Sequence, residues 1–523
     1  MLTILFLKKR IPQLLLAFFL VQCSTIKKDN VRLQQLIPAN ALQKDVDFAH
    51  KKLQKLHPNL DYYISKENLN NQFDSVKKTI NKALTPLEFY KKISPVVAAV
   101  KQGHSYVLPP QKAYTKRETK SITKKGIGPF SQFDFTYYND KLYVVRNKSY
   151  NKEIAAGTEV LSINGIKPQE LINEYSHYFS SDGFNTTFKK ELAAKRFVSY
   201  FTIENDIKDS LHYVFKYNDS IKNITIKRFK LDSLDLKTKK IRQKKVVIDK
   251  AKQRILEKKK RINGFDKNTN TFIRELHFIS KDSSIALLKI RGFKDGRFRK
   301  FYKMCFAELQ KRKTKTLIID LRNNGGGRLS EIVHLYSYLA DSSSIFLKKT
   351  EVVSRASLFE GVYFNKGNAV VKTIKTLFSP IVYSYLLLTV HKEKDGKNYF
   401  DTETKPQPIN EKAFKGKLYV LINGGSFSAS SILSTNLKGS KRATFVGEET
   451  GGDYNGTVAG FMPIVKLPHS KLNLRIGTMN FTPFYQSPVH GRGIFPDVTI
   501  IPTLEDQIRG NDPELDWILK QQP

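Results

Sequence analysis

The apolar run Leu418-Tyr-Val-Leu-Ile422 is followed directly by Asn423-Gly-Gly-Ser-Phe-Ser-Ala-Ser-Ser-Ile432. A β-branched and aromatic run that stops at Gly-Gly is typical of a buried strand that ends in a turn. Apolar residues then recur at helical spacing, so we predict a helix that begins at Ala429. A serine in such a turn is exposed at the positive end of the helix dipole, where its hydroxyl can act as a nucleophile. Taken alone, this segment also fits a serine-rich helix N-cap.

The same order of elements occurs earlier in the chain. Thr316-Leu-Ile-Ile-Asp320 predicts a strand, Leu321-Arg-Asn-Asn-Gly-Gly-Gly327 a loop, and residues 330–339 a helix. Repeated strand, glycine-rich turn and helix indicate an α/β layer built of crossover units. A phosphate-binding loop would continue with Lys-Ser/Thr, but Arg328-Leu329 stands there, which argues against a nucleotide site.

Two other regions precede this layer. Residues 31–110 predict helices, one of which begins at Thr85-Pro86, and the helical pattern ends at Gly103-His-Ser-Tyr106. Residues 125–232 predict short strands, with a hairpin signal at Asn164-Gly165. We therefore predict an α/β fold (α+β overall), in which a helical N-terminal region and a small β domain precede an α/β core at residues 276–508.

The chain of 523 residues carries a net charge of +41, and thirteen Lys and Arg residues fall between Lys237 and Arg261. We expect a basic helical linker at residues 233–275. A solvated helical face is one interpretation of the basic run, and a basic amphipathic helix on an anionic membrane surface or polymer is another. The sequence contains no nucleic-acid-binding motif, so no nucleic-acid partner is expected.

The N-terminus has the pattern of an export signal. Lys8-Lys9-Arg10 precedes the apolar residues 11–21, a run too short to span a bilayer. Cys23 follows, as at a bacterial lipoprotein cleavage site where the cysteine becomes acylated. We therefore expect a lipoprotein signal at residues 1–23 and a lipid-anchored protein of the bacterial cell envelope, on the periplasmic or outer-surface side. Plain secretion and an uncleaved anchor are the alternatives.

The second cysteine, Cys305, lies inside a predicted helix. With Cys23 acylated it has no disulfide partner, and two cysteines cannot build a thiolate zinc site. We expect a buried apolar thiol and neither a metal nor another cofactor.

Five segments carry a family resemblance. Four of them are Ile318-Ile-Asp-Leu-Arg-Asn-Asn-Gly-Gly-Gly327, Asn423-Gly-Gly-Ser-Phe-Ser-Ala-Ser-Ser431, Val446-Gly-Glu-Glu-Thr-Gly-Gly452 and Gly491-Arg-Gly-Ile-Phe-Pro-Asp-Val498. In this order they resemble the tail-specific, or C-terminal-processing, serine protease superfamily, which includes the tricorn core protease. The fifth, Ala156-Gly-Thr-Glu-Val-Leu-Ser-Ile-Asn-Gly165, looks like the second half of a PDZ domain. The resemblance covers residues 40–505.

This resemblance implies roles for the two glycine-rich turns. The family nucleophile is the first serine of the Ser-Ala-Ser core, which is Ser428 here. The N–H of Ala429 is expected to be one oxyanion donor. The other is expected from Gly325, Gly326 or Gly327, because glycine allows the backbone to approach the carbonyl oxygen closely.

The general base differs between branches of the family. One branch uses a lysine at the position of Asp453, and an aspartate cannot replace it because it has the opposite charge and is a weak base. The tricorn-like branch uses a histidine in a Gly-His-Ser/Thr setting, which His104 fits, with Ser105 as a group that could orient the ring. That branch has an orienting glutamate where this chain has His490. Either Asp453 or His490 could substitute for it, or the orienting group is dispensable.

The resulting hypothesis is a serine endopeptidase of the cell envelope. The PDZ-like region would bind unfolded or C-terminal peptide segments by strand addition. The first alternative is a catalytically degenerate peptide-binding lipoprotein of the same fold. A third hypothesis is a membrane-surface or nucleic-acid binder that uses the basic run.

Overall fold

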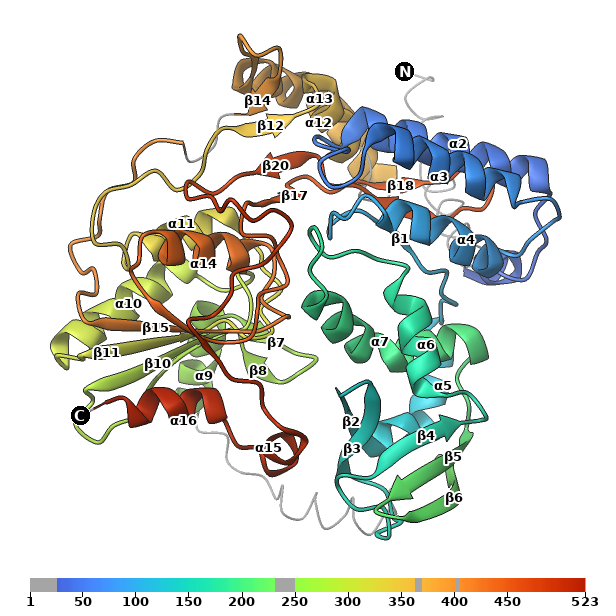
Figure 1. Ribbon diagram of the computed structural model, residues 1–523, viewed down its shortest axis with the longest axis horizontal. Coiled ribbons are helices and arrows are strands. Elements are labelled where there is room, and N and C mark those ends of the chain that lie inside the picture. Colours follow the sequence, from blue (N-terminus) through green and yellow to red (C-terminus); the bar gives the residue numbers. More distant parts are fainter. Residues whose placement is uncertain (1–25, 231–249, 363–368, 401–403, 523) are drawn as a thin grey trace, which may run out of the picture.

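The computed structural model describes residues 26–230, 250–362, 369–400 and 404–522. The predicted lipidation site Cys23 and residues 237–249 of the basic run lie outside these ranges. Within them the predicted fold class is confirmed, because helices and sheets combine into a mixed architecture around one large, mostly parallel sheet (Figure 1).

The central sheet has six strands in the order β21-β16-β15-β11-β10-β9. The strands are β9 (Arg274–Phe278), β10 (Ile285–Ile290), β11 (Thr316–Asp320), β15 (Lys417–Ile422), β16 (Thr444–Gly447) and β21 (Val498–Thr499). Only β9 runs antiparallel to its neighbour. All five residues of β11 are buried, because helices cover both faces of the sheet. A strand buried on both faces is apolar on both faces, which explains the consecutive apolar residues in β11.

The two faces of the sheet bury different sets of side chains. Leu317 and Ile319 pack into a core with α10 (Phe298–Lys311), α11 (Leu329–Tyr336) and α14 (Ala429–Gly439). Ile318 points the other way and packs with Ile518 of α16 (Pro513–Lys520). In Figure 1, α11 and α14 lie above the sheet and α16 lies below it. This layering carries the carboxyl ends of β11 and β15 to one edge of the core.

The N-terminal helices are α2 (Ala39–Leu56), α3 (Lys66–Lys78) and α4 (Pro86–Ala98). The predicted start of α4 is confirmed, since Thr85 and Glu88 form a capping box with Pro86 at the first helical position. After α4 the chain turns and enters β1 (Tyr106–Leu108), which pairs with β19 (Asn473–Arg475) beside β18 (Ile464–Lys466). This pairing brings the segment around residue 104 to the C-terminal part of the chain.

A second sheet of five antiparallel strands follows in the order β2-β3-β4-β5-β6. Its elements are β2 (Phe133–Tyr138), β3 (Lys141–Asn147), β4 (Glu159–Ile163), β5 (Ser210–Tyr217) and β6 (Ser220–Lys227), with α6 (Pro168–Ser176) and α7 (Thr187–Asn205) between β4 and β5. The sequence did not predict α7, because its apolar residues do not line a single helical face.

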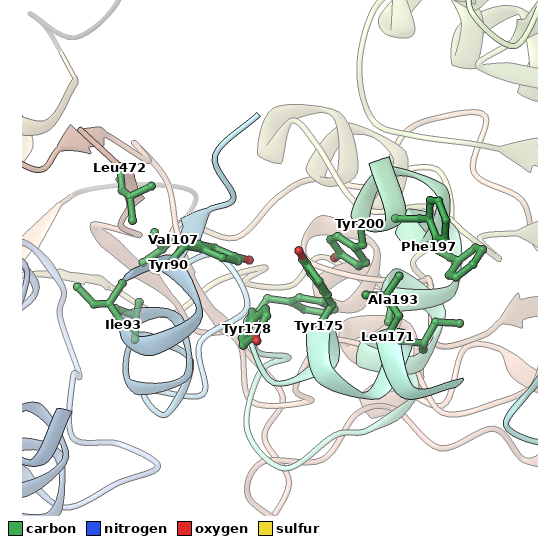
Figure 2. Packing of buried hydrophobic residues seen from close by; sticks show 14 of the residues in the cluster. Tyr90, Ile93, Val107, Leu171, Tyr175, Tyr178, Ala193, Phe197, Tyr200 and Leu472 are labelled. Atoms are coloured by element: carbon green, nitrogen blue, oxygen red, sulfur yellow. The ribbon is translucent and has the colours of Figure 1, made fainter. Parts of the chain in front are cut away.

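Tyrosine contacts join this unit to the N-terminal helices. Figure 2 shows Tyr175 of α6 between Tyr90 of α4 and Tyr200 of α7. Tyr175 stacks on Tyr200 with ring centroids 4.1 Å apart, and Tyr178 meets Tyr90 edge-on at 5.2 Å. Aromatic pairs in these geometries add stabilisation beyond the apolar area they bury. The helices and the small sheet therefore share one hydrophobic core.

The remaining elements surround the core. They are α5 (Lys116–Lys124), α9 (Lys250–Asn263), the β7–β8 hairpin (Phe265–Asp266 and Thr271–Phe272), β12 (Thr350–Val352), α12 (Arg355–Val362), α13 (Ala369–Thr389), β13 (Val390–Lys392), β14 (Asn398–Phe400), β17 (Thr457–Ala459), β20 (Met479–Phe481) and α15 (Leu504–Arg509). Leu347 makes an isolated bridge with Pro483. Among the helices of the described ranges, none combines the length and apolarity needed to cross a bilayer.

Candidate active site

Ser428 occupies a strained turn between β15 and α14. Its backbone has φ 59° and ψ −120°, a conformation that non-glycine residues rarely adopt. Such strain is typical of a nucleophile held on a sharp strand-to-helix turn. The Ser428 hydroxyl lies 3.0 Å from Nε2 of His104, close enough to donate a hydrogen bond. The structure thus brings together the predicted nucleophile and the predicted base, which are 324 positions apart in the sequence.

Hydrogen bonds join the Ser428 turn to the glycine-rich loop that follows β11. Oδ1 of Asn423 accepts from the N–H of Gly425 at 3.0 Å and from the N–H of Asn323 at 2.8 Å. The hydroxyl of Ser430 donates to the carbonyl of Asn324 at 2.8 Å. Because β11 and β15 are adjacent and parallel, the loops that follow them lie side by side. The hydrogen bonds from Asn423 and Ser430 are therefore enough to connect the two loops.

The glycine-rich loop packs directly against the Ser428 turn. A Cβ on Gly326 would lie 2.8 Å from the backbone N of Ala429, and Gly326 has φ +95°, so only glycine fits there. The N–H of Gly326 donates to Oδ1 of Asn324 at 3.0 Å. The N–H of Ala429 belongs to the first residue of α14, where helical donors have no partner four residues back. The predicted second oxyanion donor therefore narrows to Gly325 or Gly327.

His104 is buried at the turn between α4 and β1. A Cβ on the preceding Gly103 would lie 2.5 Å from the Phe427 ring, and the rings of His104 and Phe427 are 5.0 Å apart. Burial lowers the pKa of His104 to about 3, and the nearby Arg475 cation acts in the same direction. The imidazole is therefore neutral at neutral pH, which is the form that can accept a proton.

The predicted orienting groups make other contacts. Ser105 accepts a hydrogen bond from the N–H of Gly477 at 3.1 Å through its hydroxyl, so it ties backbone segments together. Asp453 accepts from Tyr63 at 2.5 Å and from the N–H of Gly491 at 2.9 Å. Nδ1 of His490 lies 3.0 Å from the hydroxyl of Tyr62. Within the described part of the chain, no carboxylate forms a hydrogen bond to the His104 ring.

A buried carboxyl that the sequence did not single out binds the backbone next to His104. Oδ1 of Asp182 accepts a hydrogen bond from the N–H of Gly103 at 2.8 Å. Its other oxygen is buried and makes no hydrogen bond within the described residues. Burial raises the pKa of Asp182 to about 7, and repulsion from Asp453 adds to this. In the sequence Asp182-Gly183 reads as an ordinary turn, so no local signal connects it to Gly103.

Residues 284–500 match the family model described as Peptidase family S41. This segment belongs to peptidase family S41. The predicted relationship to the tail-specific proteases is confirmed, and the S41 domain contains Ser428 and all of the central sheet except β9.

Two curated relatives resemble part of this chain. A tail-specific protease of Haemophilus influenzae is 27% identical over 175 residues, which are 34% of this chain and 18% of that protein. A carboxy-terminal-processing protease of Bartonella bacilliformis is 28% identical over 200 residues, which are 38% of this chain and 34% of that protein. The alignments thus span about a third or less of either relative's length.

Solved structures extend the likeness to nearly the whole chain. Mature CPAF complexed with lactacystin aligns with a TM-score of 0.57 at 14% identity, covering 92% of this chain and 97% of that one. A second structure of mature CPAF aligns with a TM-score of 0.54 at 16% identity over the same shares. Because the sequence identities are this low, the structural likeness shows a shared fold and nothing further.

Charged side chains in the motif segments form ion pairs that hold the S41 domain together. Arg322 donates hydrogen bonds to Asp320 and Asp512. Burial alone would raise the pKa of Asp320, but its hydrogen bond and attraction to Arg322 outweigh burial and lower the pKa. Glu449 accepts from Arg492 at 2.7 Å and from the N–H of Gly493 at 2.8 Å. These ion pairs fasten segments of the S41 domain to one another and do not contact Ser428.

Metal ligation has no candidate in the described ranges, where no cluster of three or more His, Cys, Asp or Glu side chains could hold an ion. Cys305 is buried in α10, and burial raises the pKa of its thiol. The reactive groups that remain at the site are a hydroxyl, an imidazole and backbone N–H groups.

Proposed function

We propose that this chain is a serine endopeptidase that hydrolyses peptide bonds of protein substrates through an acyl-enzyme. The observation that carries the proposal is the 3.0 Å contact between Nε2 of His104 and the hydroxyl of Ser428. It is supported by the strained backbone of Ser428, which costs stability and points to a selected geometry.

In the proposed reaction, Oγ of Ser428 attacks the scissile carbonyl while its proton moves to Nε2 of His104. The carbonyl oxygen becomes an oxyanion, which accepts hydrogen bonds from the N–H of Ala429 and from the N–H of Gly325 or Gly327. His104 then returns the proton to the leaving amine as the carbon–nitrogen bond breaks. Water, deprotonated by His104, attacks the ester and restores the Ser428 hydroxyl.

The base is positioned through the backbone. Asp182 holds the N–H of Gly103, and Ser105 binds the N–H of Gly477, so both neighbours of His104 are fixed. The Phe427 ring packs against the imidazole from the nucleophile turn. These contacts supply the orientation that a ring-bonded carboxylate gives in a three-residue site.

Substrate binding would use the small β sheet at residues 125–232, which the sequence likens to a PDZ domain. A cleft of about 830 Å³ lies between this unit and the core, with Tyr137 and Asp140 on one side and Arg322 and Asn423 on the other. Asn423 is the first residue of the Ser428 turn. An unfolded or C-terminal peptide segment bound in the cleft would therefore reach the nucleophile.

The proposed location is the bacterial cell envelope, with a lipid on Cys23 and the described residues on the periplasmic or outer-surface side. The export pattern of residues 1–23 supports it. The two curated relatives are named for tail-specific and carboxy-terminal processing, which supports protein termini as the substrate class.

One observation favours a catalytically degenerate peptide-binding protein as the second candidate. His104 is a buried imidazole with a pKa of about 3, and no carboxylate of the described residues bonds to its ring, which makes it a weak base. In that case the cleft would bind peptide without cleaving it.

Cleavage of unfolded casein by the purified chain separates the two candidates. We expect Ser428→Ala to abolish cleavage and labelling by a fluorophosphonate probe, and His104→Ala to slow both about a thousandfold. Ser440→Ala, at the other end of α14, should behave as wild type. Casein binding without cleavage would support the degenerate protein, and cleavage that survives both site substitutions would refute the mechanism.

A further inference from the structure

A second cavity, called the amide pocket below, lies beside the turn that carries His104. Its volume is about 210 Å³, and it shares no lining residue with the cleft of about 830 Å³ next to the small sheet. The loop between α2 and α3 and the strands β17 and β20 form its walls, and in Figure 1 these strands lie between the core and the N-terminal helices. Every lining residue is uncharged, and five carry side-chain amides: Asn59, Gln102, Asn455, Asn480 and Gln486.

The amide pocket runs from an exposed mouth to a buried floor. At the mouth, Tyr62 is 46% exposed. At the floor, Gln102, Asn455 and Thr457 are only 3%, 8% and 4% exposed. A group that enters from solvent would therefore lose most of its water at the floor, and its binding would depend on the hydrogen bonds that it finds there.

The floor contains an amide with unused hydrogen-bonding capacity. Oε1 of Gln102 accepts a hydrogen bond from the N–H of Val458 at 3.3 Å, which fixes the orientation of this amide. Among the described residues, neither Nε2 of Gln102 nor the side-chain amide of Asn480 has a hydrogen-bond partner. A buried donor without a partner costs free energy, so a ligand that accepts from Gln102 would recover that cost.

The floor is close to both Ser428 and His104. Gln102 stands two residues before His104, so its backbone is within about 7 Å of that residue, because a chain spans at most about 3.6 Å per residue. A Cβ on Gly452 would lie 3.3 Å from the backbone N of Ser428, and Asn455 follows Gly452 by three residues. A bound peptide advances about 3.4 Å per residue, so a side chain within about three residues of the scissile bond reaches the pocket.

We propose that the amide pocket binds the side chain of an Asn or Gln residue of the peptide substrate. The carboxamide oxygen would accept a hydrogen bond from Nε2 of Gln102, and the carboxamide nitrogen would donate to Oδ1 of Asn480. An ionised side chain would lose its water without meeting an opposite charge, and an apolar one would leave the Gln102 donor unpaired. This inference rests on the proposed peptidase function and specifies the substrate class of that site.

Mapping of cleavage sites tests the inference on the purified full chain. Unfolded casein is digested, and the cut sites are identified by mass spectrometry. We expect Asn and Gln to be enriched at one fixed position within about three residues of the cut. Peptides that differ only at that position then compare Gln with Met, which has a similar size, and with Glu. We expect kcat/KM for the Gln peptide to be about tenfold or more above that for the other two.

Two substitutions remove the proposed hydrogen bonds one at a time. Asn480→Leu replaces a side chain that makes no hydrogen bond among the described residues, and Gln102→Glu removes the donor at the floor but keeps the acceptor for Val458. We expect each to lower the ratio of Gln to Met cleavage about tenfold, with cleavage of the Met peptide within about threefold of wild type. Gln310→Glu, at an exposed position of α10, is the matched control and should keep the wild-type ratio.

The possible outcomes separate this inference from the proposed function. Casein cleavage without an Asn or Gln preference would overturn the inference and leave the peptidase function standing. An unchanged ratio in both pocket variants would also overturn it, because the preference would then arise elsewhere. An equal fall of the ratio in Gln310→Glu and Gln102→Glu would assign the effect to added negative charge and overturn it as well. Absence of cleavage by the wild type would refute the proposed function together with the inference.

Discussion

The two sides of the candidate site are built in different ways. The nucleophile side consists of the Ser428 turn and the glycine-rich loop at residues 323–327, which follow neighbouring parallel strands. The base side is the turn at residues 101–105, which reaches the site through the pairing of β1 with β19 and through Asp182. The nucleophile side forms wherever the sheet forms, because its two loops follow adjacent strands. The base side depends on contacts between segments from three distant parts of the chain.

The two sides should therefore respond differently to substitution. Loops that share a sheet edge keep their relation as long as the sheet is formed, because strand register fixes their starting points. The base side is tied to a sheet only by the short β1–β19 pairing, and its turn is held by individual hydrogen bonds such as those to Gly103 and Gly477. Substitutions on the base side should therefore affect the position of His104 more than the stability of the core.

The largest expected effect is on the nucleophile side, at Gly326. A methyl group there would lie 2.8 Å from the Ala429 backbone, on a residue with φ +95°. We expect Gly326→Ala to lower kcat/KM for casein cleavage about a hundredfold or more, because the oxyanion donors move. Gly325→Ala is the matched control, since a Cβ there meets nothing within 4 Å. Equal activity of the two variants would mean that the loop does not shape the site.

The next effect is on the base side, at Asp182. At pH 5 its carboxyl is protonated, and Asp182→Ala leaves the N–H of Gly103 unpaired. We expect a loss of about 1–3 kcal/mol in the free energy of unfolding, and a fall in kcat with little change in KM. Asp182→Asn keeps an acceptor oxygen and should lose less of both. If the Asn and Ala variants match in kcat, Asp182 does not position His104.

Two groups of the base side, Asp182 and His104, should make the free energy of unfolding depend on pH in opposite directions. The pKa of Asp182 is raised to about 7, so its contribution to stability is full below pH 4 and is lost as pH rises through 7. The pKa of His104 is lowered to about 3, so its contribution is present above pH 6.5 and is lost as pH falls.

Urea unfolding of variants separates the two contributions. From pH 5 to 8, the wild type should lose about 3 kcal/mol relative to Asp182→Asn, because the folded carboxyl with a pKa of about 7 stays protonated, while the unfolded one is ionised, over about two of these pH units. From pH 6.5 to 4, it should lose stability relative to His104→Ala. A parallel course of all three proteins would show that neither group changes its pKa on folding.

The smallest effect is expected at Ser105. Ser105→Ala removes the acceptor for the N–H of Gly477 and should cost about 1 kcal/mol of unfolding free energy. The comparison is Ser94→Ala, because the Ser94 hydroxyl is buried and makes no hydrogen bond among the described residues, so its removal should cost little. Thermal unfolding of both variants measures the difference in stability. An equal shift in Tm for the two variants would show that Ser105 does not help to hold the base side.

Much of the core was predictable because its signals are local. The bounds of β11 and the start of α14 follow from an apolar run that meets glycine and from helical spacing after it. The local pattern located the serine-rich turn, and the family resemblance was needed to choose Ser428 among its serines. The helix α7 was missed, because tertiary packing of Phe197 and Tyr200 stabilises a segment without an apolar face.

The sequence by itself determined the nucleophile side: Ser428, the glycines opposite it and the central sheet that carries them. The family resemblance had also named His104, but only the tertiary structure decided how the base side is built. It brought His104 within 3.0 Å of Ser428, gave Ser105, Asp453 and His490 contacts away from the imidazole, and placed Asp182 behind Gly103. The physical reason is range. Strand, turn and helix signals act over a few neighbouring residues, whereas a buried hydrogen bond between distant segments leaves no pattern in either of them.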